Sequence, residues 1–169
     1  LRFLYKDVFR MPTFNDLYYT LVGNNNLKPE YAKQYNAGVT AFSHWGIIEY
    51  ISFKADFFYN HVKDKIVAVP TKNLFVWSMR NIGLVDIKGM ELHGQLQTKP
   101  VLGLRYSLSC NYTYQAATDV TDENSATYNQ QIPYIPFETF TAMGTVAYKS
   151  FSVSYNTLFN GYRYVLGEN

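Results

Sequence analysis

The side chains best suited to chemistry are few and scattered. Asp119, Asp122 and Glu123 fall close together in the segment TDVTDEN, and carboxylate oxygens at this density can hold Ca²⁺. Their spacing does not follow the EF-hand pattern, so a solvated acidic loop is the favoured interpretation. We therefore assign no metal site here, with structural calcium as the alternative.

The spacing of the nucleophilic and basic residues does not indicate a catalytic site. His44, His61 and His93 are dispersed and lack the spacing of a metal-binding set. The sequence offers no Ser, His and Asp set, and no Cys and His set, arranged for nucleophilic attack. Cys110 is the single cysteine, so an internal disulfide is impossible. We expect no enzymatic activity and no cofactor.

The best candidates for ligand binding are aromatic and cationic residues on long links between apolar segments. Such residues can hold the apolar or planar face of a ligand. Packing between loops, or a place in an aromatic belt, explains any one of them equally well. The candidates, all expected on loops, are Tyr18, Tyr19, Phe75, Trp77, Arg80, Tyr128 and Tyr134, of which three belong to the segment 73–81.

The elements that must position these residues are strands. In LRYSLSCNYTYQ, residues 104–115, apolar and polar residues alternate with a period of two, which is typical of a strand with one apolar and one polar face. Apart from a short helical turn over 15–19, no helical periodicity is visible. The predicted strands span residues 1–9, 31–42, 48–60, 85–97, 103–116, 137–149 and 151–161.

Strand length and the rhythm of the links favour a membrane barrel. The predicted strands run to about 10–14 residues, against about 5–6 for ordinary strands and about 9–11 for a tilted strand that crosses a bilayer. Long links over 10–30, 61–84 and 117–136 alternate with short turns. Outer-membrane barrels likewise have short turns at one end and long loops at the other. A soluble barrel or sandwich with an aromatic core stays open as the alternative.

The composition agrees with a barrel. The 169 residues include 16 Tyr and 12 Phe, an aromatic share of 18%. A net charge of +2 without any basic run argues against a nucleic-acid partner. Tyrosines near predicted strand ends fit an interfacial aromatic belt, and these are Tyr31, Tyr59, Tyr112, Tyr114, Tyr155 and Tyr162.

Six motifs, in order along the chain, resemble the C-terminal half of the barrel of TonB-dependent outer-membrane receptors. FRMPTFNDLYY (9–19) and GNNNLKPEYAKQYNAGV (23–39) resemble the family's segments at the end of one strand and the start of the next. FFYNHVKDKI (57–66), NIGLVDIKGMELHG (81–94), NYTYQAATD (111–119) and QIPYIP (131–136) resemble later strand and loop segments. Together the motifs cover nearly the whole chain.

The resemblance implies a fold and a function. Residues 1–169 are expected to be part of an all-β barrel domain, a fragment of about seven antiparallel up-and-down strands from a 22-stranded transmembrane barrel in the cell outer membrane. The family implies uptake of a scarce nutrient by TonB-coupled active transport. The nutrient is cobalamin, an iron siderophore or haem, and the motifs look closest to cobalamin receptors.

Further expectations concern the partners. A plug domain, a TonB box and closing strands are not recognised, so coupling to the TonB complex is expected through a missing N-terminal region. The expected partners are outer-membrane lipid, the nutrient chelate and a surface lipoprotein. A soluble all-β binding module and an outer-membrane barrel enzyme remain the alternative functions.

Overall fold

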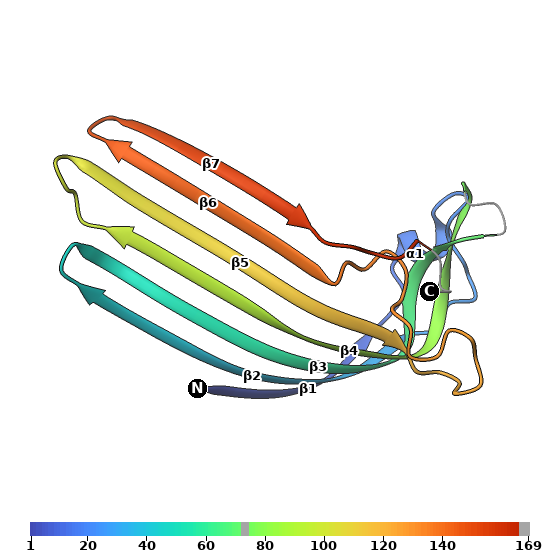
Figure 1. Cartoon of the computed structure of the whole chain (residues 1–169). Helices are drawn as coiled ribbons and strands as arrows, with labels where there is room; N and C mark the ends of the chain where they lie inside the picture. The colour runs from blue at the N-terminus through green and yellow to red at the C-terminus, as the bar shows by residue number, and fades with distance from the viewer. Residues whose placement is uncertain (72–74, 166–169) are drawn as a thin grey trace.

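One curved antiparallel sheet makes up the protein (Figure 1). The computed structural model describes residues 1–71 and 75–165, and its seven strands pair in chain order. The strands are β1 (Arg2–Arg10), β2 (Glu30–Trp45), β3 (Ile48–Pro70), β4 (Trp77–Thr98), β5 (Leu104–Asp119), β6 (Glu138–Tyr148) and β7 (Phe151–Asn160), and one short helix, α1 (Phe14–Tyr18), follows β1. Among the described residues, no helix has the length and apolarity to span a bilayer.

The register of the strands gives the sheet two chemically different faces. Residues paired directly across antiparallel strands project from the same side. We call one side the apolar face, because a typical row across it is Val39, Ala55, Leu92, Tyr112, Phe140 and Phe159. We call the other the polar face, because the adjacent row is Thr40, Lys54, His93, Asn111 and Thr141.

Large hydrophobic side chains on the apolar face are uncovered. Phe57 is 54% exposed, Phe53 49% and Leu108 46%. Within residues 1–71 and 75–165 no second sheet packs against them. An apolar surface of this extent needs a non-aqueous neighbour, as the predicted lipid contact of the alternating strands requires.

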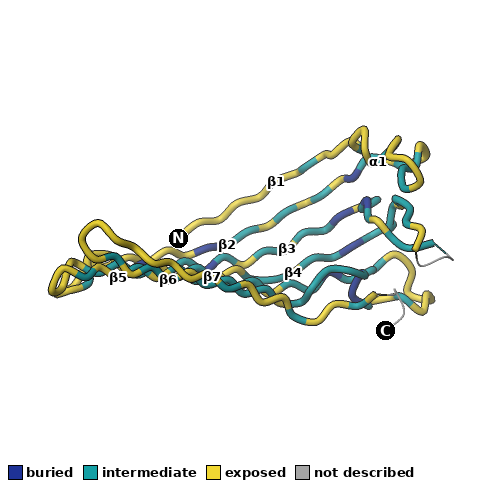
Figure 2. The backbone as a smooth tube through the Cα atoms, turned by 90° about the horizontal axis from the view of Figure 1, so that it is seen from above, coloured by how far each residue is buried: buried dark blue, intermediate teal, exposed yellow. Residues whose placement is uncertain are grey.

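The small buried core lies at one end of the sheet. Val62, Val85, Ala117 and Ile132 form a buried cluster. Figure 2 shows buried positions of β2, β3 and β4 near that end, and further buried positions farther along β2 and β3. Ile132 belongs to the link between β5 and β6, and the neighbouring Gln131 side chain accepts a hydrogen bond from the Ala117 N–H at 2.7 Å. This link therefore folds back over the polar face.

The two ends of the sheet differ as the spacing of the links predicts. Short turns join β2 to β3, β4 to β5 and β6 to β7 at one end, and the long links and α1 lie at the other (Figure 1). Positive φ angles at Gly46, Gly103 and Lys149 close the three short turns. Seven antiparallel strands and the helical turn near 15–19 are confirmed.

The predicted loop over residues 61–84 is wrong. β3 continues to Pro70 and β4 begins at Trp77, so Trp77 and Arg80 lie in a strand and not in a loop. The run Lys63, Asp64 and Lys65 interrupts the apolar alternation, and Asp64 adopts a φ of 54°. The ladder nevertheless resumes and pairs Lys65 with Ile82 and Pro70 with Trp77, because backbone hydrogen bonds do not depend on the side-chain pattern.

The aromatic belt is also only partly where it was expected. Tyr59 lies on the apolar face, and its row contains Tyr5 and Tyr35. Tyr59, Tyr112 and Tyr155, however, lie near the middle of β3, β5 and β7, so their assignment to strand ends is wrong. Alternation of apolar and polar residues predicts a strand, but it does not show at which residue the strand ends.

Candidate functional site

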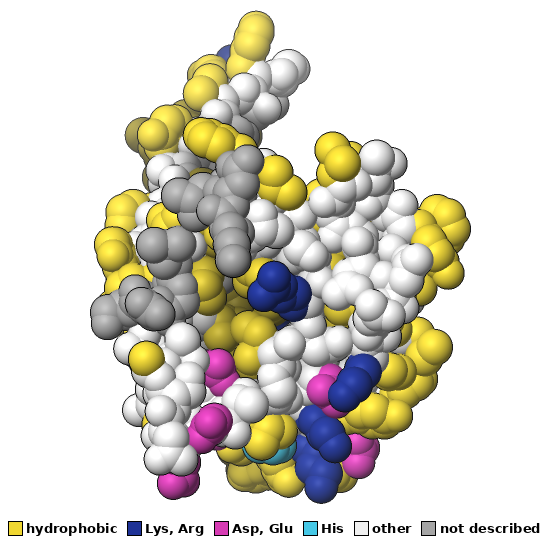
Figure 3. Space-filling view, turned by 90° about the vertical axis from the view of Figure 1, so that its right-hand side faces the viewer, with side chains coloured by type: hydrophobic (Ala, Val, Ile, Leu, Met, Phe, Trp, Pro, Cys, Tyr) yellow, Lys and Arg dark blue, Asp and Glu magenta, His cyan; other side chains and the backbone are white. Residues whose placement is uncertain are grey.

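The long links gather at the end of the sheet that also carries the small core. Figure 3 shows this end with acidic and basic side chains around a hollow and hydrophobic side chains on its floor and at its margin. We call it the mouth, made of α1, the links 11–29 and 120–137, and the ends of β3 and β4.

An ion-pair cluster attaches the α1 link to the sheet. Arg10 contacts Glu30 at 3.0 Å and Asp16 at 2.8 Å. The buried Glu30 carboxylate also accepts a hydrogen bond from the Ile66 N–H at 2.6 Å and lies 3.9 Å from Lys65 Nζ. Charged partners satisfy Glu30 on both sides, which a buried carboxylate requires.

Helix α1 starts with a complete capping box. Thr13 accepts a hydrogen bond from the Asp16 N–H, and Asp16 accepts one from the Thr13 N–H. Burial acts to raise the pKa of the Asp16 carboxyl, but hydrogen bonds from Thr13 and the contact with Arg10 outweigh it and hold that pKa below its usual value. Asp16 is therefore a stable anion that links the helix to β1.

Two asparagines fasten the second part of this link to the β3–β4 hairpin. The Asn81 side-chain N–H group donates to the Lys28 and Asp64 carbonyls at 3.0 and 2.7 Å, and its oxygen accepts from the Lys28 N–H. Asn24 donates to the Met79 carbonyl at 2.9 Å. The segments GNNNLKPE and NIGL thus meet at the mouth, where they fix one loop on another.

Among the predicted ligand-binding residues, the structure brings Trp77 and Tyr134 together. Their rings lie 4.6 Å apart in a tilted arrangement, at the distance expected of an attractive aromatic pair. A pocket of about 220 Å³ lies at the same end and is lined by Pro70, Ile82, Ile132 and Pro133, with Asp119 and Thr127 as polar groups. Apolar walls with a few polar groups are typical of small-ligand sites.

The remaining candidates are spread over the mouth. Tyr18 ends α1, Tyr19 caps it, Phe75 lies in the turn before β4, Arg80 lies in β4 and Tyr128 lies in the 120–137 link. All five are exposed, and Phe75 most of all at 94%. Residues 73 and 74 of the predicted segment lie outside the described residues. The structure therefore brings Trp77 and Tyr134 into direct ring contact and places the other candidates around the same end of the sheet.

The acidic loop organises itself through hydrogen bonds. Asp119 accepts from the Thr121 N–H at 2.9 Å and from the Thr127 hydroxyl at 3.3 Å, and Asp122 accepts from the Asn124 N–H at 2.9 Å. In the described part of the chain, no group of three or more His, Cys, Asp or Glu side chains is placed to hold a metal ion.

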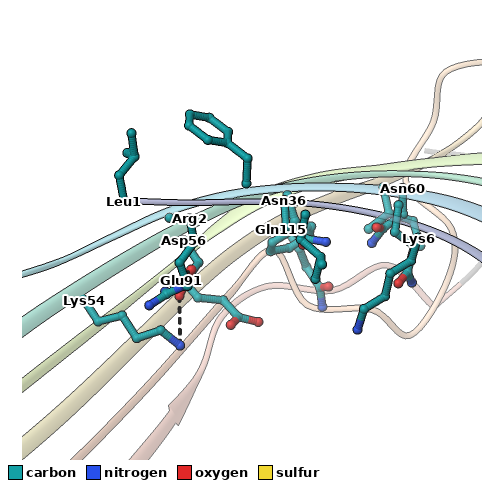
Figure 4. Close-up of a pocket in the computed structure, with 15 residues that line it drawn as sticks. Leu1, Arg2, Lys6, Asn36, Lys54, Asp56, Asn60, Glu91 and Gln115 are labelled. Carbon is teal, nitrogen blue, oxygen red and sulfur yellow. Dashed lines mark hydrogen bonds and ion pairs between the residues drawn. The ribbon is translucent and has the colours of Figure 1, made fainter.

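The polar face carries a charged groove near its N-terminal strand. Arg2, Lys54, Asp56 and Glu91 project from one side of the sheet, and Leu1 projects from the other (Figure 4). Asp56 lies 2.6 Å from Arg2 and 3.0 Å from Lys54. The groove has a volume of about 840 Å³, and Lys6, Gln34, Asn36, Asn60 and Gln115 also line it. This face can hold water or polar protein and is unsuited to lipid.

Sequence reasoning missed the Arg10, Asp16 and Glu30 cluster and the bridging amide of Asn81. All four residues belong to motifs quoted for the family resemblance. Their position within loop motifs was the one sequence signal that these charged and amide residues hold the loops in place. The sequence does not show which residues they contact, because their partners lie up to 53 residues away along the chain.

Comparison with known proteins agrees with this architecture. The family model described as TonB dependent receptor-like, beta-barrel matches residues 1–169. Vitamin B12 transporter BtuB of Vibrio vulnificus is 32% identical over 90 residues, which are 53% of this chain and 14% of that protein. The transporter of the same name from Photobacterium profundum is 33% identical over 118 residues, 66% of this chain and 17% of that protein.

These matches decide the class of the protein. The chain spans less than a fifth of the length of the curated relatives that it matches. The proteins of the family are outer-membrane receptors and transporters, and the two relatives are transporters by name. The apolar face is accordingly the lipid side of a barrel wall, the polar face lines the lumen, and the mouth is extracellular. The chain belongs to the TonB-dependent receptor β-barrel family and is a segment of an outer-membrane barrel.

Proposed function

We propose that this barrel segment serves a receptor that imports vitamin B12 or a closely related corrinoid across the outer membrane. The observation that carries the proposal is the family match along all 169 residues, together with identity of about one third to two vitamin B12 transporters. Iron siderophores and haem are the competing nutrients within the same family.

The two faces of the wall support transport. Lipid contacts only the apolar face, so the polar face with Arg2, Lys54, Asp56 and Glu91 is free to line a passage or to meet protein inside the barrel. We propose that a plug domain in another part of the full-length receptor occupies this lumen. Active transport then requires coupling to the TonB complex through an N-terminal region, and a surface lipoprotein is a further proposed partner.

We assign the first contact with the nutrient to the mouth. Trp77 and Tyr134 offer a paired aromatic surface, and the apolar pocket beside Ile82 and Pro133 has room for a small planar group. Tyr18, Tyr19, Phe75, Arg80 and Tyr128 are exposed around it and are proposed as adaptable contacts.

A binding comparison with the full-length receptor tests the nutrient. Cyanocobalamin, a ferric siderophore and haem are titrated separately against the purified receptor, and uptake of each is measured in cells with and without a working TonB complex. We expect saturable binding of cyanocobalamin and uptake that requires TonB. Binding of only the siderophore or haem would overturn the corrinoid assignment, and uptake independent of TonB would overturn active transport.

The mouth assignment has its own control. Trp77→Ala and Tyr134→Ala are expected to weaken corrinoid binding about tenfold each, since a well-placed aromatic contact contributes roughly 0.5–1.5 kcal/mol beyond its buried area. Trp45→Ala, at the turn between β2 and β3 at the opposite end, is the matched control and is expected to bind normally. An equal loss of corrinoid affinity in all three variants would contradict the assignment of the nutrient site to the mouth.

A further inference from the structure

The polar face of the wall changes in charge from one side of the sheet to the other. On β1 to β4 the groove below the mouth is lined by charged side chains, which include Arg2, Lys6, Lys54, Asp56 and Glu91. On β5 to β7 the alternate residues that project from the same face are uncharged over 107–113, 139–145 and 152–160. We call these two parts of the polar face the charged sector and the uncharged sector.

The polar groups of the uncharged sector bond to one another along the wall. The Asn111 side chain donates to the Thr141 hydroxyl at 3.1 Å, and its oxygen lies 2.7 Å from Nδ1 of His93, at the border between the two sectors. The Thr145 and Ser154 hydroxyls lie 2.8 Å apart. Because the wall itself satisfies these groups, they do not require a partner from inside the lumen.

The charged sector holds groups that the wall does not neutralise. Asp56 lies 2.6 Å from Arg2 and 3.0 Å from Lys54. For Lys6 and Glu91, in contrast, no ion pair of 4 Å or less occurs within residues 1–71 and 75–165. Protein that neutralises such charges inside the lumen is hard to displace, because separating an enclosed ion pair leaves a charge unpaired. Contacts to hydroxyl and amide groups exchange for water at little cost.

We infer that the uncharged sector borders the path of the nutrient through the lumen, and that the charged sector stays in contact with the plug during transport. The inference rests on the proposed function. A corrinoid carries neutral amide groups around its ring, and these can exchange hydrogen bonds with Ser, Thr and Asn side chains as the molecule moves. Transport requires contacts that are weak enough to be left again, and the uncharged sector offers no fixed charge that would retain the nutrient.

Thr40 and Thr141 form a matched pair for testing this inference. Both project from the polar face in one row of the register, which runs through Lys54, His93 and Asn111. Thr40 lies in the charged sector, where its hydroxyl accepts a hydrogen bond from Arg2 at 2.8 Å, and Thr141 lies in the uncharged sector. The two positions therefore differ in their sector but share residue type and face.

The first test measures uptake by the full-length receptor in cells. Cyanocobalamin binding and TonB-dependent uptake are compared for Thr141→Trp, Thr40→Trp and the conservative change Thr141→Ser, with heat-modifiable migration as the measure of folding. We expect all three variants to bind cyanocobalamin as the native receptor does. Thr141→Trp should take it up at least about tenfold more slowly, which corresponds to a barrier raised by about 1.4 kcal/mol, and the other two variants should keep the native rate.

The second test measures exposure during transport and needs no bulky side chain, so it decides the question if Thr141→Trp fails to assemble. With Cys110→Ser removing the native thiol, Thr141→Cys or Thr40→Cys is labelled in cells with a membrane-impermeant maleimide, with or without cyanocobalamin and a working TonB complex. We expect labelling at 141 to rise only when both are present, and labelling at 40 to stay constant.

The outcomes separate this inference from the proposed function. Equal uptake by the two Trp variants, or equal labelling at the two positions, would overturn the inference and leave the corrinoid assignment in place. A native receptor that takes up no cyanocobalamin would overturn the proposed function, and this inference with it.

Discussion

Glu30 is a buried carboxylate between a strand and a loop, and its neighbours explain why it stands there. Arg10 neutralises one oxygen at 3.0 Å, and the other accepts the Ile66 N–H at 2.6 Å. The same Arg10 reaches Asp16 in α1. One carboxylate therefore ties β1, the α1 link and the upper part of β3 together, so that the loop at the mouth has a fixed base.

Removal of Glu30 should loosen this base without unfolding the wall. Glu30→Ala leaves the buried Ile66 N–H without its acceptor, which costs about 1–3 kcal/mol. We expect faster amide hydrogen exchange in peptides that cover residues 10–30 and 62–70 of the full-length receptor. Glu49→Ala, an exposed residue near the start of β3, is the control and should leave exchange unchanged. Unaltered exchange in the Glu30 variant would mean that the cluster does not anchor the loop.

Acid should loosen the same loop through Asp16. Its pKa is held below the ordinary value of 3.8, so its stabilising contribution is complete above that value and is lost as the pH falls through the folded-state pKa. The effect is expected to be under about 1 kcal/mol, because Arg10 is partly exposed to solvent. Protease cleavage in the α1 link should therefore rise below about pH 4 in the native protein. Asp16→Asn should already be cleaved faster at pH 7 and show no further rise.

At the scale of elements, the alternation of apolar and polar residues was enough to predict seven strands, their order and their two faces. It failed at the upper parts of β3 and β4, where Lys63, Asp64 and Lys65 have the composition of a loop. There the backbone ladder and the covering Ile132 link sustain the strands, and both involve residues distant in sequence. The pairing of Trp77 with Tyr134 was unpredictable for the same reason, since it depends on how the 120–137 link folds back.

Close packing between neighbouring strands gives Gly89 a role that Gly94 does not have. A Cβ atom at Gly89 would collide with the Tyr114 carbonyl oxygen and approach Phe58 Cζ to 2.7 Å, whereas a Cβ at Gly94 meets nothing within 4 Å. Both glycines lie in β4, so they form a matched pair. Gly89→Ala should cost about 1–3 kcal/mol through overpacking and lower the thermal midpoint of the full-length receptor. Gly94→Ala should stay within about 0.5 kcal/mol of the native protein, and an equal effect of the two changes would contradict the packing argument.

At the scale of the whole molecule, the wall is organised by the solvent on each side. Leu108 and Ser109 are adjacent in β5 but project from opposite faces, opposite Gly144 and Met143 respectively. An arginine on the lipid side near the bilayer centre costs about 2–4 kcal/mol, and one on the lumen side much less. Leu108→Arg should therefore reduce the yield of assembled, heat-modifiable receptor in the outer membrane, and Ser109→Arg should not. Similar yields would mean that the faces are not separated as the register indicates.

A charged residue is also rejected by a dry protein core, so the arginine pair needs a measurement that identifies the apolar neighbour as lipid. With Cys110→Ser removing the native thiol, a fluorophore is attached at Leu108→Cys or at Ser109→Cys in the full-length receptor, which is then placed in bilayers with brominated acyl chains. Because bromine quenches only probes within contact distance of the chains, we expect strong quenching at 108 and little at 109. Because Leu108 is 46% exposed, a probe at this position fits without displacing core residues. Quenching at 109 alone, or at neither position, would contradict the assignment of the apolar face to lipid, and with it the placement of the lumen on the polar side.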